Sequence, residues 1–280
     1  MAATLRAARR YAGELTAVVS VADDGGSSGR LRDALGIPAP GDLRRCLVAL
    51  GDEPLWCRAF EHRFDAGELE GHALGNLVIA GLASASGDFL AALEEAGRLV
   101  GAVGRVLPAT TGPVILKAMV GGAEVHGQVR VQQARGGPID RVDLVPPDAE
   151  PPPAVLRALA QADQVILGPG SLYTSVLAVV AVPSIRDALA AAAATKVYVC
   201  NLRPEHETAG YDATDHLVAL RYHGVEVDAI VLDPDALPAG DVYAAAGVGG
   251  SEVVSASLAL PDDRGHDPVR LADVLAKLVR

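Results

Sequence analysis

Apolar residues follow two patterns that alternate along the chain. Almost continuous apolar runs occupy 15–22, 164–167, 196–200 and 229–233, and a shorter run lies at 253–258. Runs of this kind are typical of strands buried on both faces of a parallel sheet. Segments with helical spacing separate them, so the chain is predicted to be an α/β protein with a three-layer, Rossmann-like, doubly wound and mostly parallel sheet.

The remaining predicted elements are helices and one region of short strands. Between 105 and 145, short alternating pieces separated by glycines, including 128–131, predict a β excursion built on a hairpin. Residues 240–250 are expected to be a flexible connection. Helices are predicted over 2–13, 43–50, 54–64, 71–81, 88–100, 154–161, 176–182, 184–193, 211–222 and 268–279, with a short helical turn at 30–35.

These elements predict a single domain over 1–280, with a helical insertion at about 40–104 and the β excursion at about 105–150. The first predicted element is a helix, whereas nucleotide-binding α/β domains normally begin with a strand and a glycine-rich turn. We expect such a strand and turn to precede Met1. Without them, one edge of the strand at 15–22 is expected to be open.

Composition narrows the class of partner. The net charge of −11 and the pI near 5.0 argue against a protein that coats nucleic acid. No apolar run is long enough for a membrane span. Cys46, Cys57 and Cys200 form no metal-binding motif, which favours reduced thiols in a soluble cytoplasmic protein. A small-molecule ligand is therefore expected.

The first candidate site begins where the strand at 15–22 ends. Two adjacent carboxylates at a strand end are suitable acceptors for a ribose, an amide or hydrated Mg²⁺, and glycines and serines after them let a ligand approach the backbone. An Asx-turn with a Ser/Gly cap is the alternative, and it needs no ligand. The candidate residues are Asp23, Asp24, Gly25, Gly26, Ser27, Ser28, Gly29 and Arg30.

Two further strand ends carry candidate residues. Gly168, Gly170, Ser171 and Leu172 form a strand-to-helix turn whose free N–H groups would attract a phosphate, and an ordinary βα turn without a ligand is the alternative. The strand at 196–200 is followed by Asn201, Glu207 and Thr208. Because the carboxyl ends of parallel strands share one edge, these loops predict a ligand crevice there.

Three residues of the helical region join the candidates. Asp42 is a helix N-cap candidate. His72 and Asn76 lie four positions apart and so on one helical face. That spacing permits joint contact with a ligand, and equally a hydrogen bond between the two side chains.

Six segments together resemble one family, the YvcK-like gluconeogenesis factors. They are VADDGGSSGRLR, GDLRRCLVALGDEPL, GHALGNL, ILGPGSLYTSVL, VYVCNL and ETAGYDATDHL, in this order over nearly the whole chain. That family is related to CofD-like 2-phospho-L-lactate transferases. Their corresponding loop resembles Ala22, Asp24, Ser28, Gly29 and Leu31 but lacks the double glycine and Arg30.

The resemblance implies a fold that binds a nucleotide diphosphate, and for the YvcK-like branch a UDP-sugar, notably UDP-N-acetylglucosamine. It also implies a role in cell shape and envelope synthesis during growth on gluconeogenic carbon sources. Two function classes stay open: a binding regulator without turnover, and a transferase of a phosphate-linked group. In the transferase, Asp23 or Asp24 would hold Mg²⁺ on the diphosphate, and Asp24 is the named metal candidate. No cofactor other than Mg²⁺ is expected, and a homodimer and a regulatory protein partner are left open.

Overall fold

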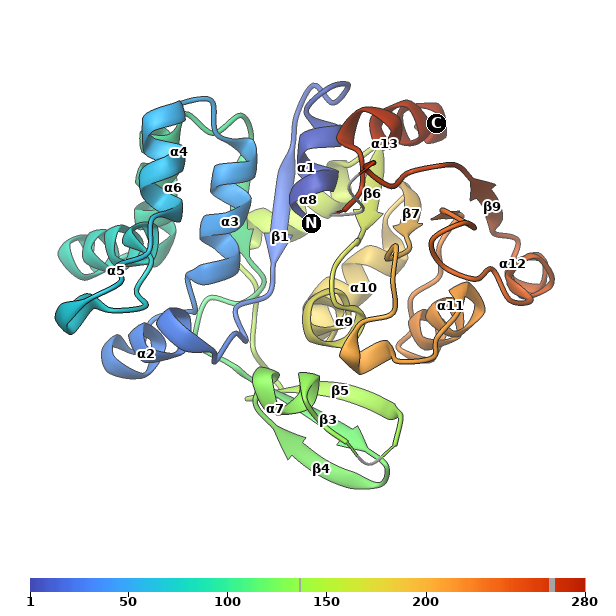
Figure 1. Cartoon of the computed structure of the whole chain (residues 1–280), viewed down its shortest axis with the longest axis horizontal. Helices are drawn as coiled ribbons and strands as arrows, with labels where there is room; N and C mark the ends of the chain where they lie inside the picture. The colour runs from blue at the N-terminus through green and yellow to red at the C-terminus, as the bar shows by residue number, and fades with distance from the viewer. Residues whose placement is uncertain (136, 262–264, 280) are drawn as a thin grey trace.

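The computed structural model describes residues 1–135, 137–261 and 265–279. Two parallel sheets form the centre of the molecule (Figure 1). The first pairs β1 (Thr16–Val19) with β2 (Arg105–Pro108). The second has the order β6 (Gln164–Leu167), β7 (Thr195–Val199), β8 (Ala229–Leu232) and β9 (Glu252–Ser255), with every neighbouring pair parallel.

This arrangement confirms the predicted α/β class with mainly parallel strands. The strands are divided between two sheets rather than joined in one, because no hydrogen-bonded ladder links β1 to β6 among the described residues. β1 is also less covered than its apolar sequence predicts. Its residues alternate between half-buried and buried, whereas all four residues of β8 are buried.

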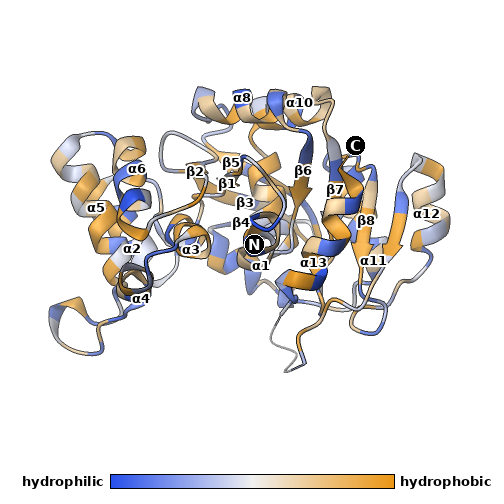
Figure 2. Cartoon of the chain, turned by 90° about the horizontal axis from the view of Figure 1, so that it is seen from above, coloured by the Kyte–Doolittle hydropathy of each residue, from blue (hydrophilic) through white to orange (hydrophobic). Residues whose placement is uncertain are grey.

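Helices cover both faces of the larger sheet. α8 (Pro153–Gln161) and α10 (Pro183–Ala191) lie on one side, and α1 (Ala2–Ala8) and α13 (Pro268–Leu275) lie on the other (Figure 2). β8 between these layers is coloured as hydrophobic along its length. The three layers bury the aliphatic side chains that dominate the composition, which is the main stabilising contribution to such a core.

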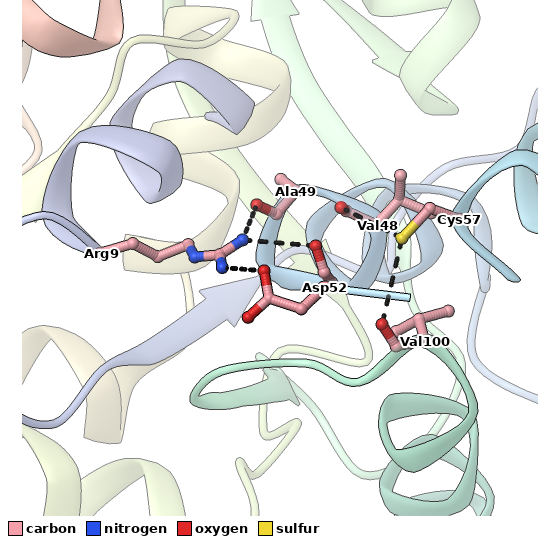
Figure 3. A network of polar contacts seen from close by, with 7 residues as sticks. Arg9, Val48, Ala49, Asp52, Cys57 and Val100 are labelled. Atoms are coloured by element: carbon pink, nitrogen blue, oxygen red, sulfur yellow. Dashed lines mark hydrogen bonds and ion pairs between the residues drawn. The ribbon is translucent and has the colours of Figure 1, made fainter. Parts of the chain in front are cut away.

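Four helices lie in the region of the expected helical insertion: α3 (Gly41–Leu50), α4 (Pro54–Glu61), α5 (Leu74–Ser86) and α6 (Phe89–Val100). Arg9, just after α1, attaches to the end of α3 (Figure 3). Its guanidinium donates to the carbonyl oxygens of Ala49 and Gly51 at 3.5 and 3.3 Å and forms an ion pair with Asp52. Because free C-terminal carbonyls attract cations, this contact fixes α3 relative to α1.

A small antiparallel sheet lies beyond the carboxyl ends of the parallel strands (Figure 1). Its order is β4 (Ala123–His126), β3 (Ile115–Val120) and β5 (Ile139–Val145). The predicted excursion began earlier, but residues 105–108 form β2 in the parallel sheet instead. Residues 128–131, predicted as a strand, belong to the helix α7 (Gln128–Gln132). That prediction was wrong because two valines separated by one residue also fit a single helical turn.

Two other predictions need correction. α2 (Gly26–Leu35) begins four residues before the predicted turn, so the glycines and serines expected in a loop form its first turn. Residues 240–250, expected to be flexible, contain the helix α12 (Val242–Gly249), because the alanines at its centre favour a helix. The remaining elements are a π-helical turn (Leu172–Val176) continued by α9 (Leu177–Val180), α11 (Ala213–Tyr222), and short 3₁₀ turns at Gly67–Leu69, His206–Thr208 and Ala276–Leu278.

Across the described ranges, no single helix is both long and apolar enough to cross a membrane. The segments Leu172–Val180 and Pro183–Ala191 meet the length and composition criteria only as a pair, bent by 78°.

Candidate functional site

A cavity of about 370 Å³ opens at the carboxyl end of β1. Its volume lies within the range of roughly 300–1,000 Å³ that is usual for small-molecule sites. Segments distant in sequence form its walls: the loop after β1, the first turns of α2, α3 and α5, the helix α7 and the turn after β6. The lining residues are Asp23, Gly25, Gly26, Ser27, Ser28, Gly41, Asp42, Arg44, Arg45, Arg63, Asn76, Gln128, Val129, Gln132, Ser171 and Ser175.

The structure thus brings together many of the residues predicted from sequence. Asp23, Gly25, Gly26, Ser27, Ser28, Asp42, Asn76 and Ser171 all line this one cavity. They come from separate predicted loops and helices. Their convergence at a strand end is the arrangement in which open α/β sheets usually bind ligands.

Two helices direct their N-termini at the cavity. Gly25 is the N-cap of α2 and Gly26 its first residue. Gly41 and Asp42 are the first two residues of α3, whose N-cap is Pro40 rather than the predicted Asp42. Neither helix has a side-chain cap on its N-cap residue. The first N–H groups of a helix have no partner within the helix and carry partial positive charge, so this wall attracts anions.

Three arginines add full positive charge to the same wall. Arg45 forms an ion pair with Asp42 one turn earlier in α3. Arg63 donates to the carbonyl oxygen of Gly71 at 2.8 Å and is otherwise exposed. Arg44 is only 5% exposed, donates to the Phe60 carbonyl oxygen at 3.0 Å and keeps its Nε without a partner. Helix termini and guanidinium groups together are suited to phosphate.

The carboxylate of Asp23 lies in this positive environment. It accepts a hydrogen bond from the Gly25 N–H at 2.9 Å. Burial raises the pKa of Asp23, and the bonds from the Gly25 N–H and the Ser28 hydroxyl partly oppose this rise. Of the two carboxylates in the first loop, Asp23 is the one that lines the cavity.

Asp24 is directed elsewhere. Its Oδ1 accepts a hydrogen bond from the Val129 N–H at 2.9 Å. Gly127, at φ +98°, makes room for the same carboxylate, since a Cβ there would lie 2.4 Å from Asp24 Oδ2. Asp24 does not line the cavity, and its contacts are those of a cap on α7 rather than of a metal ligand.

Ser27 connects the predicted pair His72 and Asn76, of which only Asn76 lies on a helix: α5 begins at Leu74, so the prediction that both share one helical face was wrong. His72 Nδ1 lies 3.0 Å from Ser27 Oγ, and Asn76 Nδ2 donates to the same oxygen at 3.1 Å. Burial and the nearby Arg30 lower the pKa of His72, which favours its neutral imidazole. His72 and Asn76 therefore meet through Ser27 rather than through a direct bond, and of the two only Asn76 reaches the cavity.

Gly29 and Arg30 have packing roles. A Cβ on Gly29 would lie 2.1 Å from the carbonyl oxygen of Asp24, so only glycine fits in this turn. Arg30 donates to the carbonyl oxygen of Glu70 at 2.8 Å on the surface. Both hold α2 against its neighbours without reaching the cavity.

The second and third predicted loops are bound to each other. Gly170 donates its N–H to Asn201 Oδ1 at 3.2 Å. Glu207, 7% exposed, accepts from the N–H groups of Tyr173 and Thr174 at 2.8 and 3.4 Å. The helix start that was expected to hold a phosphate therefore already holds a carboxylate from within the chain. Ser171 alone of this turn's predicted residues lines the cavity.

Three residues predicted in these loops are structural. Leu172 is fully buried in the core. Thr208 is also fully buried, and its hydroxyl accepts from the Glu205 N–H at 2.9 Å. Gly168, at φ +77°, accepts from Thr4 Oγ1 at 2.9 Å, which ties the end of β6 to α1.

The cavity fits Mg²⁺ only as an ion shared with a ligand. Among residues 1–135, 137–261 and 265–279, no three His, Cys, Asp or Glu side chains are grouped to hold a metal. Asp42 is paired with Arg45, which leaves Asp23 as the available carboxylate. Mg²⁺ commonly binds one or two protein carboxylates and completes its shell with phosphates and water.

Several lining residues were not predicted: Arg44, Arg45, Arg63, Gln128 and Gln132. The segment 128–131 was predicted as part of the β excursion, so Gln128 and the adjacent Gln132 were not candidates. A helix that begins at a strand-end cavity presents its first-turn side chains to that cavity, and this signal could have identified Arg44 and Arg45.

Comparison with known proteins agrees with the fold and the resemblance. The chain is 47% identical over 223 residues to the gluconeogenesis factor of Halalkalibacterium halodurans, covering 78% of this chain and 69% of that protein. It is 43% identical over 241 residues to the gluconeogenesis factor of Bacillus subtilis, covering 84% and 75%. A crystal structure of a UPF0052-family protein from Bacillus halodurans superposes with a TM-score of 0.90 at 39% identity, covering 98% of this chain and 94% of that one.

A comparison with protein-family models also matches most of the chain. A family model described as 2-phospho-L-lactate transferase CofD matches residues 1–258. The resemblance to YvcK-like and CofD-like proteins is thereby confirmed. On this match and the similarity of its relatives, the chain belongs to the CofD family.

Proposed function

We propose that this protein binds a nucleotide diphosphate sugar of the UDP-N-acetylglucosamine type in the β1 cavity and acts as a regulator without turnover. The observation that carries the proposal is the convergence of the α2 and α3 N-termini with Arg44, Arg45 and Arg63 on one wall. That wall suits a diphosphate, because anions are stabilised at helix N-termini and guanidinium groups bind phosphate oxygens.

The proposed biological role follows from relatives. Two of them are named gluconeogenesis factors. We extend this role to the present chain as a cytoplasmic regulator of carbon and envelope metabolism, and of cell shape, during gluconeogenic growth. A regulator needs a ligand whose concentration reports metabolic state, and a nucleotide sugar joins carbon supply to envelope synthesis.

A second candidate function is transfer of a phosphate-linked group. The description of the matching family model and the position of Asp23 favour it. In such a reaction, Asp23 would hold Mg²⁺ against the diphosphate, and the ion would screen the negative charge of the Asp23 carboxylate from the phosphates. The described lining residues include no histidine, lysine or cysteine that could act as a separate base.

Binding measurements separate these functions. Thermal shift and calorimetry with UDP-N-acetylglucosamine, UDP-glucose, GDP and GTP, each with and without Mg²⁺, should show saturable binding of UDP-sugars. Chromatography of the nucleotides after incubation should show no conversion. Nucleotide conversion with Mg²⁺ would favour the transferase, whereas absence of binding by every nucleotide would contradict both candidates.

A variant that removes one positive charge tests where the phosphates bind. Arg45→Gln should weaken UDP-sugar binding about tenfold, the effect of losing roughly 1.4 kcal/mol from a charge-assisted contact. Arg98→Gln is the matched control, because Arg98 also pairs with a carboxylate three positions earlier but lies on α6, away from the cavity. Equal binding by both variants would place the phosphates elsewhere.

A further inference from the structure

The α7 wall of the cavity differs in chemistry from the wall formed by α2 and α3. Gln128 and Gln132 both line the cavity and both are half-buried. Four positions apart in a helix, they lie on the same face. Within the part of the chain that the structure describes, neither side-chain amide has a hydrogen-bond partner. The pair therefore offers free donors and acceptors to whatever fills the cavity.

The lining residues outside α7 differ from those of α7 in charge. Arg44, Arg45 and Arg63 lie on the side of α3 and the segment before α5, whereas the α7 lining residues are Gln128, Val129 and Gln132. A ligand that satisfies both walls has an anionic part and an uncharged part rich in hydroxyl or amide groups. A purely anionic ligand would leave the glutamine amides without partners.

The α7 wall is held in place by the first loop. Asp24 Oδ1 accepts from the Val129 N–H at 2.9 Å, one residue from Gln128. A Cβ on Gly25 would lie 3.2 Å from Val129 Cγ2, so the loop backbone packs closely against α7. A wall fixed before binding loses little freedom when the ligand arrives, which favours specific recognition.

We propose that Gln128 and Gln132 are specificity-determining residues that hydrogen-bond the uncharged polar part of the ligand. The inference rests on the proposed function, because it takes the phosphates to lie against α2 and α3. Two parts of a UDP-sugar share the required chemistry: the hydroxyl and amide groups of the sugar, and the imide edge of the base.

The test uses the full chain and isothermal titration with three probes: UDP-N-acetylglucosamine, UDP, and N-acetylglucosamine 1-phosphate. The double variant Gln128→Leu/Gln132→Leu removes both amides at similar volume. Gln133→Leu is the matched control, since Gln133 is the C-cap that follows α7, is exposed and does not line the cavity. The single variant Gln132→Glu keeps the side-chain shape, and it replaces the double variant in the test if the double variant has a much lower melting temperature.

The double variant should bind UDP-N-acetylglucosamine about 30-fold more weakly than the wild type, the loss expected for two neutral hydrogen bonds, while Gln133→Leu binds normally. Gln132→Glu should also bind more weakly, because it loses an amide donor and adds charge near the phosphates. Weakening confined to the sugar phosphate or to UDP identifies the part recognised, and either result supports the inference. Unchanged affinity of the double variant, or of Gln132→Glu if that variant is needed, overturns the inference alone. A wild type that binds none of the probes overturns the proposed function as well.

Discussion

The carboxylate of Asp24 accepts a hydrogen bond from the backbone N–H of Val129 over 2.9 Å, although the residues lie 105 positions apart. The bond joins the loop after β1 to a helix of the antiparallel excursion. Asp23, the residue before Asp24, lines the cavity instead. The two adjacent carboxylates thus have different positions: Asp23 lines the cavity, and Asp24 holds α7, which forms one of its walls.

Substitution of Asp24 should separate capping from direct ligand binding. Asp24→Ala removes the acceptor, so α7 loses its cap, the free energy of unfolding falls by about 1 kcal/mol, and UDP-sugar binding weakens. Asp24→Asn should retain most of both, because asparagine caps helices as well as aspartate does. Urea unfolding and calorimetric titration measure the two effects.

Asp88→Ala is the control for this cap. Asp88 accepts from the N–H groups of Leu90 and Ala91 at the start of α6 and does not line the cavity. It should cost similar stability and leave binding unchanged. Strong loss of Mg²⁺-dependent binding in Asp24→Asn would contradict the capping role and restore Asp24 as a metal ligand.

Glu207 should make stability depend on pH. Burial raises the pKa of Glu207 above its ordinary value of 4.5, an effect that the N–H groups of Tyr173 and Thr174 partly oppose. As pH rises above 4.5, the unfolded chain releases this proton before the folded protein does. The contribution of Glu207 to stability therefore falls as pH rises from that value through the raised folded pKa.

Glu207→Gln cannot titrate, so its stability relative to the wild type should increase across the same pH window. Urea unfolding from pH 4 to pH 8 would measure the difference at each pH. Glu94→Gln, which removes an exposed glutamate paired with Arg98 at 3.2 Å, provides the comparison. A constant difference between Glu207→Gln and the wild type would show that Glu207 titrates alike in both states.

The sequence was sufficient for features that follow from local pattern. Apolar runs located β1, β6, β7 and β8, and the carboxyl-end rule brought Asp23 and Ser171 to one place. The sequence alone could not distinguish the role of Asp23 from that of Asp24, because the direction of the Asp24 side chain depends on Val129, more than a hundred positions away.

Other errors have the same origin in long-range contacts. The start of the helix after β6 has the sequence of a phosphate site, but Glu207 from the next loop occupies its N–H groups. Arg44 fits an outward helical position, yet it is 5% exposed because α5 and Phe60 pack over it. Neither contact leaves a periodic signal in the chain, so only the folded structure reveals them.

Two glycines of α5 test the packing around Arg44. A Cβ on Gly75 would lie 2.8 Å from Arg44 Cδ and 2.8 Å from the Phe60 ring, whereas a Cβ on Gly81 meets nothing within 4 Å. Gly75→Ala should therefore destabilise the fold by about 1–3 kcal/mol through overpacking. Gly81→Ala should stabilise it by about 0.5–1 kcal/mol, because alanine is the better helix former and the space is open.

The same pair should differ in binding. Gly75→Ala displaces Arg44 from the cavity wall, so UDP-sugar affinity should fall, while Gly81→Ala should bind as the wild type does. Because both substitutions add one methyl group to the same helix, the difference between them isolates the contact with Arg44 and Phe60. Two results together would contradict this packing: equal stability of Gly75→Ala and Gly81→Ala in urea, and UDP-sugar binding by Gly75→Ala equal to that of the wild type. Arg44 would then not be held against α5, and its proposed contact with the phosphates would be wrong.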